Sequence, residues 1–253
     1  MRFALLGSGS RGNATLIEAG DTCLMIDCGF SLTAAERRLA RLGRSPRDID
    51  AILVTHEHTD HAGGVARFAA RYGIPLWLTA GTQAALASAS FDVTVSAVAA
   101  DELFAIGDVE VLPVAVPHDA REPVQFVFGD GRHRIGVLTD AGCVTPSMLQ
   151  AFSRCEALVL ECNHDATLLQ LGDYPPALKE RVGGPHGHLS NEQAADFLRR
   201  IDTGRLVHVV AAHLSEKNNT PALARAALAA ALGCAPQAVE VATQEEGLAW
   251  RQT

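Results

Sequence analysis

The chain has 253 residues, of which 48% are hydrophobic and 20% charged, and its formal net charge at pH 7 is −8. This is the composition of an ordinary globular protein that is long enough to bury a core. The acidic balance argues against a protein that coats nucleic acid through a basic face.

The beginning of the chain holds one short apolar run, residues 3–6, which is too short for the core of a signal peptide. No later stretch is long enough to span a membrane, so we expect a cytoplasmic protein without membrane contact. The six cysteines form no Cys-x-x-Cys pair and lie in apolar segments, which indicates buried, reduced thiols. Because no linker, low-complexity tract or repeat interrupts the sequence, residues 1–253 are expected to form a single domain.

The first predicted strand, residues 3–6, leads into a loop rich in glycine and serine at residues 7–13. This loop is either an ordinary turn, which is the commoner case, or a cradle for phosphate. Alternation over residues 14–19 and 23–27 predicts a β-hairpin. Asp27, at the end of that hairpin, can either brace a metal site or cap the helix that is expected around residues 34–42.

The sequence His56-Glu57-His58-Thr59-Asp60-His61 packs three imidazoles and two carboxylates between a buried strand, residues 50–55, and a helix, residues 63–72. Imidazole and carboxylate together suit Zn²⁺, Mn²⁺ or Fe²⁺. Since residues i and i+2 of an extended segment point the same way, His56 and His58 can bind one ion, while Asp60 and His61 bind a second. The alternative is a solvated, histidine-rich loop.

Apolar runs predict more strands over residues 76–78, 109–116, 124–128, 134–138, 157–160 and 206–212, and a last one over 239–242. Helices are expected over residues 82–89, 191–201 and 221–232, the last two opened by capping sequences. Several predicted strands are followed by, or end at, a polar residue that could bind metal or take part in catalysis: His118, Asp140, Glu161 and His213. Alone, Asp140 is better explained by an Asx-turn than by a bridge between two ions. The recurrence predicts that these groups share one rim of a sheet-rich scaffold.

The order His56-x-His58-x-Asp60-His61, His118, Asp140, His213 resembles the metallo-β-lactamase fold superfamily. The resemblance implies an α/β (α+β) fold, a four-layer αββα sandwich with a dinuclear site along one edge. It also implies that His56, His58 and His118 hold one ion, that Asp60, His61 and His213 hold the other, and that Asp140 bridges them. The cofactors would be two divalent ions, Zn²⁺ or Mn²⁺, with Fe²⁺ also compatible. Thiol-ligated β-lactamases of the superfamily carry a cysteine in place of Asp140, so antibiotic hydrolysis is not expected.

Within the superfamily, the chain resembles the YycJ-type (WalJ or VicX) bacterial proteins, which are regarded as DNA exonuclease-like phosphodiesterases. This likeness rests on four segments, residues 8–13, 161–165, 187–192 and 213–220. The pair of Glu161 and His188 is also similar to the acid machinery of the tRNA 3′-processing endonuclease. It implies that His188, supported by Glu161, protonates the leaving group. Two metal ions would make a bound water more acidic, and Asp60 and Asp140 would orient that water for attack. The alternative for His188 is a structural residue at a helix entrance.

For substrate binding, we expect a pocket for a terminal phosphate built from small polar side chains and one lysine, namely Ser8, Ser10, Asn13, Ser215, Lys217 and Asn218. Such a pocket would favour 5′–3′ exonuclease-like action. His164 and His186 either touch the substrate or a ligand, or are structural. His133 and His208 are expected to be structural.

These observations favour a dinuclear metal-dependent hydrolase, a phosphodiesterase or nuclease that acts on the ends of DNA or RNA. A second hypothesis is a hydrolase of small esters, thioesters or cyclic phosphodiesters, which the same ligands can support. A third is a non-catalytic metal-binding accessory or signalling protein. The pair of Glu161 and His188 favours the first hypothesis, because ester hydrolysis does not obviously need it.

Overall fold

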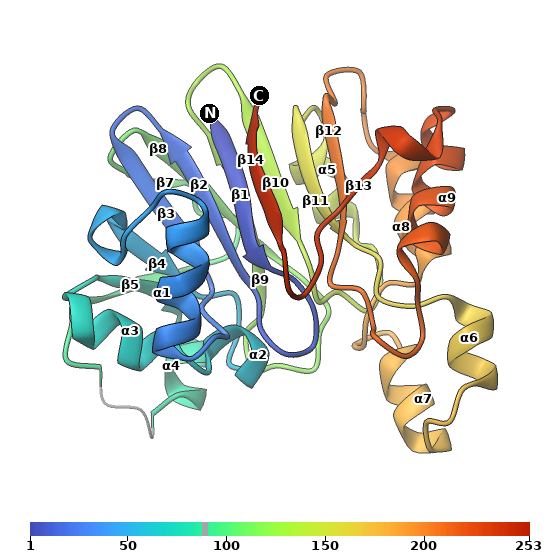
Figure 1. Ribbon diagram of the computed structural model, residues 1–253, viewed down its shortest axis with the longest axis horizontal. Helices are drawn as coiled ribbons and strands as arrows, with labels where there is room; N and C mark the ends of the chain where they lie inside the picture. Colours follow the sequence, from blue (N-terminus) through green and yellow to red (C-terminus); the bar gives the residue numbers. More distant parts are fainter. Residues whose placement is uncertain (88–90) are drawn as a thin grey trace.

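The computed structural model describes residues 1–87 and 91–253. In these ranges, two seven-stranded sheets pack face to face, and helices cover their outer faces (Figure 1). The four-layer αββα sandwich expected from the sequence is therefore confirmed.

Sheet 1 carries most of the N-terminal part of the chain. Its strand order is β14 (Leu248–Gln252), β1 (Arg2–Gly7), β2 (Ala14–Ala19), β3 (Thr22–Ile26), β4 (Ala51–Leu53), β5 (Leu76–Thr79), β6 (Val95–Val98). The pairs from β14 to β3 are antiparallel, and those from β3 to β6 are parallel.

Sheet 2 has the complementary arrangement. Its order is β13 (Glu240–Val241), β12 (His208–Ala212), β11 (Ala157–Glu161), β10 (Arg134–Leu138), β9 (Val124–Gly129), β8 (Val109–Ala115), β7 (Phe104–Ile106). The pairs from β13 to β10 are parallel, and those from β10 to β7 are antiparallel.

Side chains alternate between two apolar layers along each central strand. In β3, Leu24 and Ile26 point into the layer between the sheets, whereas Met25 points outward. In β11, Val159 joins the inner layer and Leu160 the outer one. Both faces of these strands are buried, so the sequence shows continuous apolar runs there.

Helices α1 (Leu32–Arg41) and α3 (Val65–Tyr72) cover sheet 1. Helices α5 (Pro146–Phe152), α8 (Asn191–Arg200) and α9 (Pro221–Leu232) cover sheet 2. Two short helices, α2 (Thr59–Ala62) and α4 (Ala80–Ala85), follow β4 and β5. Helices α6 (Ala166–Leu171) and α7 (Pro176–Val182) extend beyond the sandwich at the lower right of Figure 1.

The structure corrects some expected elements. The strand expected last, over residues 239–242, is β13, and a further strand, β14, follows it. The sequence pattern does not predict β14, because only Leu248 in it is buried. The expected helix 63–72 is α3, which begins two residues later at Val65, and the additional short helix α2 precedes it, separated by Gly63 and Gly64. The expected helix 82–89 is α4, and the end of that expected range lies outside the described residues. In the described part of the chain, no helix is long and apolar enough to cross a membrane.

The topology brings the polar strand ends to one edge. β3 and β4 run parallel, so the residues that follow them leave sheet 1 at the same edge. β10, β11 and β12 are also parallel to one another, and β8 has the same direction because β9 is antiparallel to both β8 and β10. The side chains that follow these strands therefore gather where the two sheets meet.

Candidate metal centre

Seven candidate ligands from both sheets meet at this edge. Sheet 1 contributes His56, His58, Asp60 and His61, which follow β4, and sheet 2 contributes His118, Asp140 and His213. Within each of three triplets, one possible ligand atom per residue lies within 4.8 Å of the others: His56, His58 and His118; His56, His61 and Asp140; Asp60, His61 and His213. The structure thus brings together the ligand set expected from the sequence.

The His56 ring is held by a chain of hydrogen bonds. The Thr55 hydroxyl donates to Asp27 Oδ2 at 2.8 Å and lies 2.9 Å from His56 Nδ1. Because the hydroxyl hydrogen is engaged with Asp27, His56 Nδ1 carries the proton and donates to Thr55. The lone pair of His56 is then on Nε2, which is buried and has no hydrogen-bond partner.

The same reasoning fixes His61 and His118. His61 Nδ1 donates to Asp27 Oδ2 at 2.8 Å, which leaves Nε2 at 3.0 Å from Asp140 Oδ2. His118 Nδ1 donates to the Gly187 carbonyl at 2.9 Å, which leaves Nε2 at 3.2 Å from His58 Nδ1. Of the two roles considered for Asp27, the structure shows the brace, since its carboxylate orients two candidate ligands.

Glu161 orients the ring of His213, the fourth of the anchored imidazoles. His213 Nδ1 donates to Glu161 Oε1 at 2.9 Å, and His213 Nε2 is buried without a hydrogen bond, 3.5 Å from Asp60 Oδ2. His188 Nδ1 donates to the same Glu161 oxygen at 2.9 Å. The other oxygen accepts the backbone N–H groups of Ala141 and Leu189, both at 3.0 Å. Glu161 therefore supports both the expected acid and a candidate metal ligand.

The residues present fit divalent metal ions. His56 Nε2, His213 Nε2 and Asp140 Oδ2 are buried and make no hydrogen bond, which is costly unless a cation compensates for it. Four imidazoles are anchored through Nδ1 and direct Nε2 inward, as metal-binding histidines do. Nitrogen and oxygen donors of this kind are the ligands of zinc, manganese and iron.

The electrostatics agree with this donor set. Burial lowers the pKa of His56 and His118, so both rings stay neutral and keep a lone pair. His213 differs: burial opposes its charged form, but Asp140, Asp60 and Glu161 outweigh burial and raise its pKa to about 10, so this ring carries a proton that a bound cation would displace. The pKa of Asp140 lies well below its usual value because the neighbouring His213 and His61 overcome the effect of burial. The Asp140 carboxylate therefore stays negatively charged although it is buried.

We call the edge of the sandwich that carries the seven candidate ligands the metal edge. Three of the residues there have left-handed backbone conformations. The φ angles are 59° at Asp27, 53° at Asp140 and 55° at His213, each directly after or near the end of a strand. This region is unfavourable for residues other than glycine, and it recurs at functional sites. The chain turns sharply at these positions, which directs the side chains along the edge of the sandwich.

Most residues expected to bind a terminal phosphate make structural hydrogen bonds. Ser8 Oγ accepts the N–H of His213 at 2.8 Å, and Ser215 Oγ accepts that of Asn218 at 3.2 Å. Asn13 accepts the N–H of Gly9 at 2.9 Å and reaches the Asp60 carbonyl at 3.3 Å. Ser10 and Lys217 are exposed. The phosphate pocket stays a prediction, because four of its six residues already brace the loops that carry the ligands.

The remaining histidines differ in their surroundings. His164 is buried, with Nδ1 unpartnered, and burial lowers its pKa; His186 is exposed. His208 contacts Glu240 at 3.2 Å and the Gln252 carbonyl at 3.0 Å, as a structural residue would.

Asp119 was not singled out by the sequence pattern, although it lies beside the centre. Its Oδ1 is 3.5 Å from His118 Nε2 and 3.7 Å from His58 Nε2. In the sequence, the feature that could have identified Asp119 is its position directly after His118. Asp119 Oδ2 accepts from Arg181 Nε at 2.5 Å, so a helix beyond the sandwich reaches the centre.

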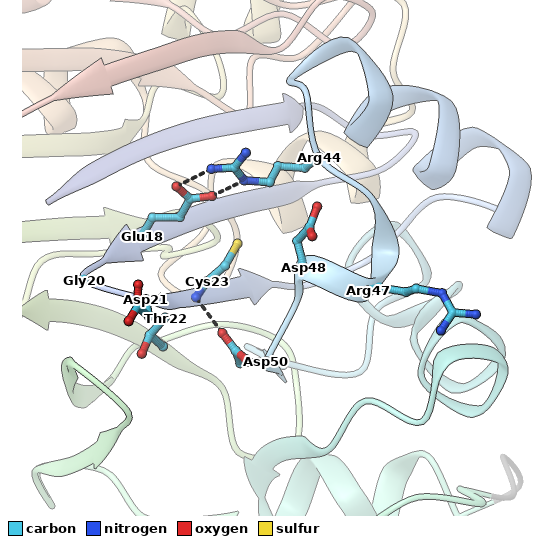
Figure 2. A pocket seen from close by; sticks show the side chains of 9 residues that line it. All are labelled: Glu18, Gly20, Asp21, Thr22, Cys23, Arg44, Arg47, Asp48 and Asp50. Carbon is cyan, nitrogen blue, oxygen red and sulfur yellow. Dashed lines mark hydrogen bonds and ion pairs between the residues drawn. The ribbon is translucent and has the colours of Figure 1, made fainter.

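A separate cavity of about 440 Å³ lies at the other end of β3, where Thr22 begins the strand (Figure 2). Three of the four carboxylates that line it are already engaged: Glu18 binds Arg44, Asp48 accepts the backbone N–H of Ser45 at 2.7 Å, and Asp50 accepts that of Cys23 at 2.8 Å. These pairings leave no donor set comparable to the metal edge among the residues that line this cavity.

Comparisons with known proteins agree with the fold. A model of the beta-lactamase superfamily domain matches residues 22–209. Exodeoxyribonuclease YycJ of Bacillus anthracis is 33% identical over 89% of this chain and 86% of its own length. Exodeoxyribonuclease WalJ of Streptococcus pneumoniae is 33% identical over 88% of this chain and 85% of its own length.

Among solved structures, the metallo-beta-lactamase fold protein YhfI of Bacillus subtilis superposes with a TM-score of 0.77. It is 15% identical and covers 100% of this chain and 99% of its own, so the likeness concerns the fold. Together with the two seven-stranded sheets and the histidine-rich edge, these matches show that the chain belongs to the β-lactamase superfamily, with the metallo-β-lactamase fold, and is a relative of YycJ and WalJ.

Proposed function

We propose that this protein is a hydrolase that uses two divalent metal ions to cleave phosphodiester bonds at the ends of nucleic acid strands. The observation that carries the proposal is the pair of Glu161 and His188, 2.9 Å apart, beside the seven candidate ligands. An acid in that position is what an alkoxide leaving group requires.

The proposed ligands divide between the two ions. His56, His58 and His118 would hold one ion, Asp60, His61 and His213 the other, and Asp140 would lie between them. Asp140 supports this division, because Oδ2 is 3.0 Å from His61 Nε2 while Oδ1 is 3.8 Å from His118 Nε2. Zn²⁺ and Mn²⁺ are the proposed cofactors, and Fe²⁺ fits the same donors. When bound, such ions supply Lewis-acid chemistry, which neutralises a phosphodiester and makes water more acidic.

The residues of the chain supply orientation and proton transfer. Asp60 and Asp140 would orient the attacking water through their carboxylates. His188, whose Nδ1–H is held by Glu161, has Nε2 left to protonate the leaving oxygen. Proton transfer from a positioned side chain contributes about 10²- to 10⁴-fold to a rate.

The two exodeoxyribonuclease relatives support DNA as the substrate to test before RNA. Each matches more than four fifths of this chain and of its own length. The acidic net charge of −8 is compatible with this substrate, because two divalent ions would supply local positive charge where a phosphate binds.

The deciding experiment measures degradation of 5′-labelled single- and double-stranded DNA with Mn²⁺ or Zn²⁺. RNA, a cyclic phosphodiester and a generic ester are tested in parallel. We expect shortening of DNA from an end, with little turnover of the ester. Fast ester hydrolysis without nuclease activity would instead support the second hypothesis, and no turnover of any substrate in metal-loaded protein would support the third.

The terminal-phosphate pocket has a test of its own. Ser10 and Lys217 are the exposed members of the expected set, and Lys217 lies 5.6 Å from the centre of the Tyr174 ring. If they bind a 5′-phosphate, 5′-phosphorylated strands should be degraded faster than 5′-hydroxyl strands, and Lys217→Ala should remove the difference. Equal rates for the two strands in the wild-type protein would contradict the pocket.

A further inference from the structure

His58 is anchored differently from the other candidate histidine ligands. His56, His61, His118 and His213 each have Nδ1 within 2.8–2.9 Å of an acceptor. His58 instead turns Nδ1 toward the centre, 3.2 Å from His118 Nε2. Its side chain is 29% exposed, whereas those of His61 and His118 are fully buried. The remaining nitrogen, Nε2, faces outward.

Asp119 is the carboxylate that faces this outward nitrogen. Its Oδ1 lies 3.7 Å from His58 Nε2, within the range of an ion pair. If His58 offers the Nδ1 lone pair to a metal ion, its proton is on Nε2 and points toward Asp119. Asp119 then occupies the place that Asp27 takes for His61 and Glu161 takes for His213.

Arg181 holds Asp119 in that place. Its Nε donates to Asp119 Oδ2 at 2.5 Å, and its guanidinium is 61% exposed. Arg181 lies in the last turn of α7, one of the two helices that extend beyond the sandwich (Figure 1).

The segment that begins with Arg181 contacts the centre at more than one point. The Gly187 carbonyl accepts from His118 Nδ1 at 2.9 Å. The N–H of His188 donates to the Val182 carbonyl at 2.9 Å, which ties the expected acid to the end of α7. The end of α7 and the segment that follows it are therefore coupled to His118 through Gly187 and to His58 through Asp119.

We propose that Asp119 and Arg181 are positioning residues for the metal ion that His58 would hold: Asp119 orients His58, and Arg181 acts through Asp119. The inference rests on the proposed two-ion centre. We call the contacts from Arg181 through Asp119 to His58 the relay. Because the relay is long and partly exposed, the ion at His58 should be the more weakly bound of the two. Helix α7 would then set the affinity of one metal position while leaving the other unchanged.

The test is a titration of metal-free protein with Mn²⁺ and, in parallel, with Zn²⁺, followed by calorimetry and chelator competition. The variants are Asp119→Asn, Arg181→Gln and the double variant. A matched control is Asp196→Asn on α8, which removes an exposed carboxylate that pairs with Arg200 at 3.2 Å, away from the centre. Thermal melting of each metal-free variant checks that it is folded.

We expect Asp119→Asn to weaken the weaker site about 10- to 100-fold, as loss of a partner that orients a ligand does, and to leave the other site unchanged. Arg181→Gln should weaken the same site by a smaller factor. The double variant should match Asp119→Asn, because Arg181 acts through Asp119. The control should bind as wild type does.

Other results overturn the relay. Wild-type affinity at both sites in Asp119→Asn would show that His58 needs no such partner. Complete loss of one ion would make Asp119 a ligand, and additive effects in the double variant would show that Arg181 acts independently. A wild-type protein that binds no metal would instead overturn the proposed function on which the relay rests.

Discussion

The two carboxylate oxygens of Glu161 have different partners. Oε1 accepts from both His188 and His213, whereas Oε2 accepts two backbone N–H groups. Burial raises the pKa of a carboxyl group, but the two imidazoles outweigh it, and the pKa of Glu161 falls to about 2. One charged group thus fixes the orientation of the proposed acid and of a proposed ligand at the same time.

Replacement of His188 tests the proposed acid. His188 lies with Asp140, Glu161 and His213 in a fourth group whose possible ligand atoms are within 4.8 Å of one another, but it is not one of the seven proposed ligands, so His188→Ala should keep wild-type metal content. Turnover of DNA should fall by about 10²- to 10⁴-fold, the usual contribution of a general acid. Metal analysis and single-turnover kinetics measure the two effects. Loss of bound metal in this variant would make His188 a ligand or a fold residue.

Replacement of Asp140 tests the proposed bridge. Asp140→Ala removes the carboxylate that approaches His61 and His118, so at least one of two ions should be lost. Elemental analysis after gel filtration measures the stoichiometry, with Asp196→Ala as a control for an exposed carboxylate. Occupancy by two ions in Asp140→Ala would contradict the bridge.

Glu18, far from the metal edge, gives a prediction about stability. Burial raises the pKa of its carboxyl, but hydrogen bonds from Arg44 and Arg2 outweigh burial and lower the pKa from the usual 4.5. The stabilisation is therefore complete above pH 4.5 and is lost as the pH falls through the lowered value. Urea unfolding between pH 6 and pH 3 should show a smaller decline in the free energy of unfolding for Glu18→Gln. The same decline in both proteins would contradict the assignment.

At the scale of elements, the segment that follows α7 packs closely against the turn after β10. A Cβ atom on Gly142 would lie 2.4 Å from the carbonyl carbon of Pro185 and 2.5 Å from the backbone nitrogens of His186 and Gly187. Only a residue without a side chain permits this approach. The contact keeps His188 and the Gly187 carbonyl at their places beside the centre.

Gly142→Ala should therefore displace the segment 185–188. We expect a cost of about 1–3 kcal/mol in the free energy of unfolding, as for other overpacked positions, together with slower turnover. Gly204→Ala is the control, since its Cβ would meet only the Asp202 side chain, at 3.1 Å. Chemical denaturation and nuclease assays measure both effects; wild-type stability in Gly142→Ala would show that the segment yields easily.

The sequence predicts strands with buried faces and capped helices better than it predicts the edges of the fold. β11 and α8 were predictable from a continuous apolar run and a capping box. β14 was not, since only Leu248 in it is buried, and Trp250 is partly exposed, with Arg2 4.4 Å from the centre of its ring. The contact of Arg181 with Asp119 joins residues 62 positions apart and depends on how α7 packs, which no local pattern encodes. The ligand positions were predictable because each follows a strand.

At the scale of the whole molecule, the proposed ions would join the two sheets. His56, His58, Asp60 and His61 follow β4 of sheet 1, whereas His118, Asp140 and His213 follow strands of sheet 2. The apolar layer between the sheets holds them together without metal, and its residues include Phe3, Leu53, Phe126 and Val159. Metal removal should therefore loosen one edge while the fold persists.

Chelation of the metal should lower the melting temperature without changing the far-UV circular dichroism at 25 °C. Free metal at about 100 times the dissociation constant stabilises a folded protein by about 2.7 kcal/mol for one site. Differential scanning calorimetry with and without added Mn²⁺ or Zn²⁺ measures the shift. A melting temperature independent of metal would contradict binding at this edge.

The turn between β13 and β14 supports the metal edge from a distance in sequence. Gln244 accepts the N–H of Arg11 and donates to the Gly12 carbonyl, and the Thr243 carbonyl accepts the N–H of Ser8. Ser8 in turn accepts the N–H of His213. In genetic terms, a stop codon just after Val241 should be a loss-of-function allele, although it removes none of the candidate ligands.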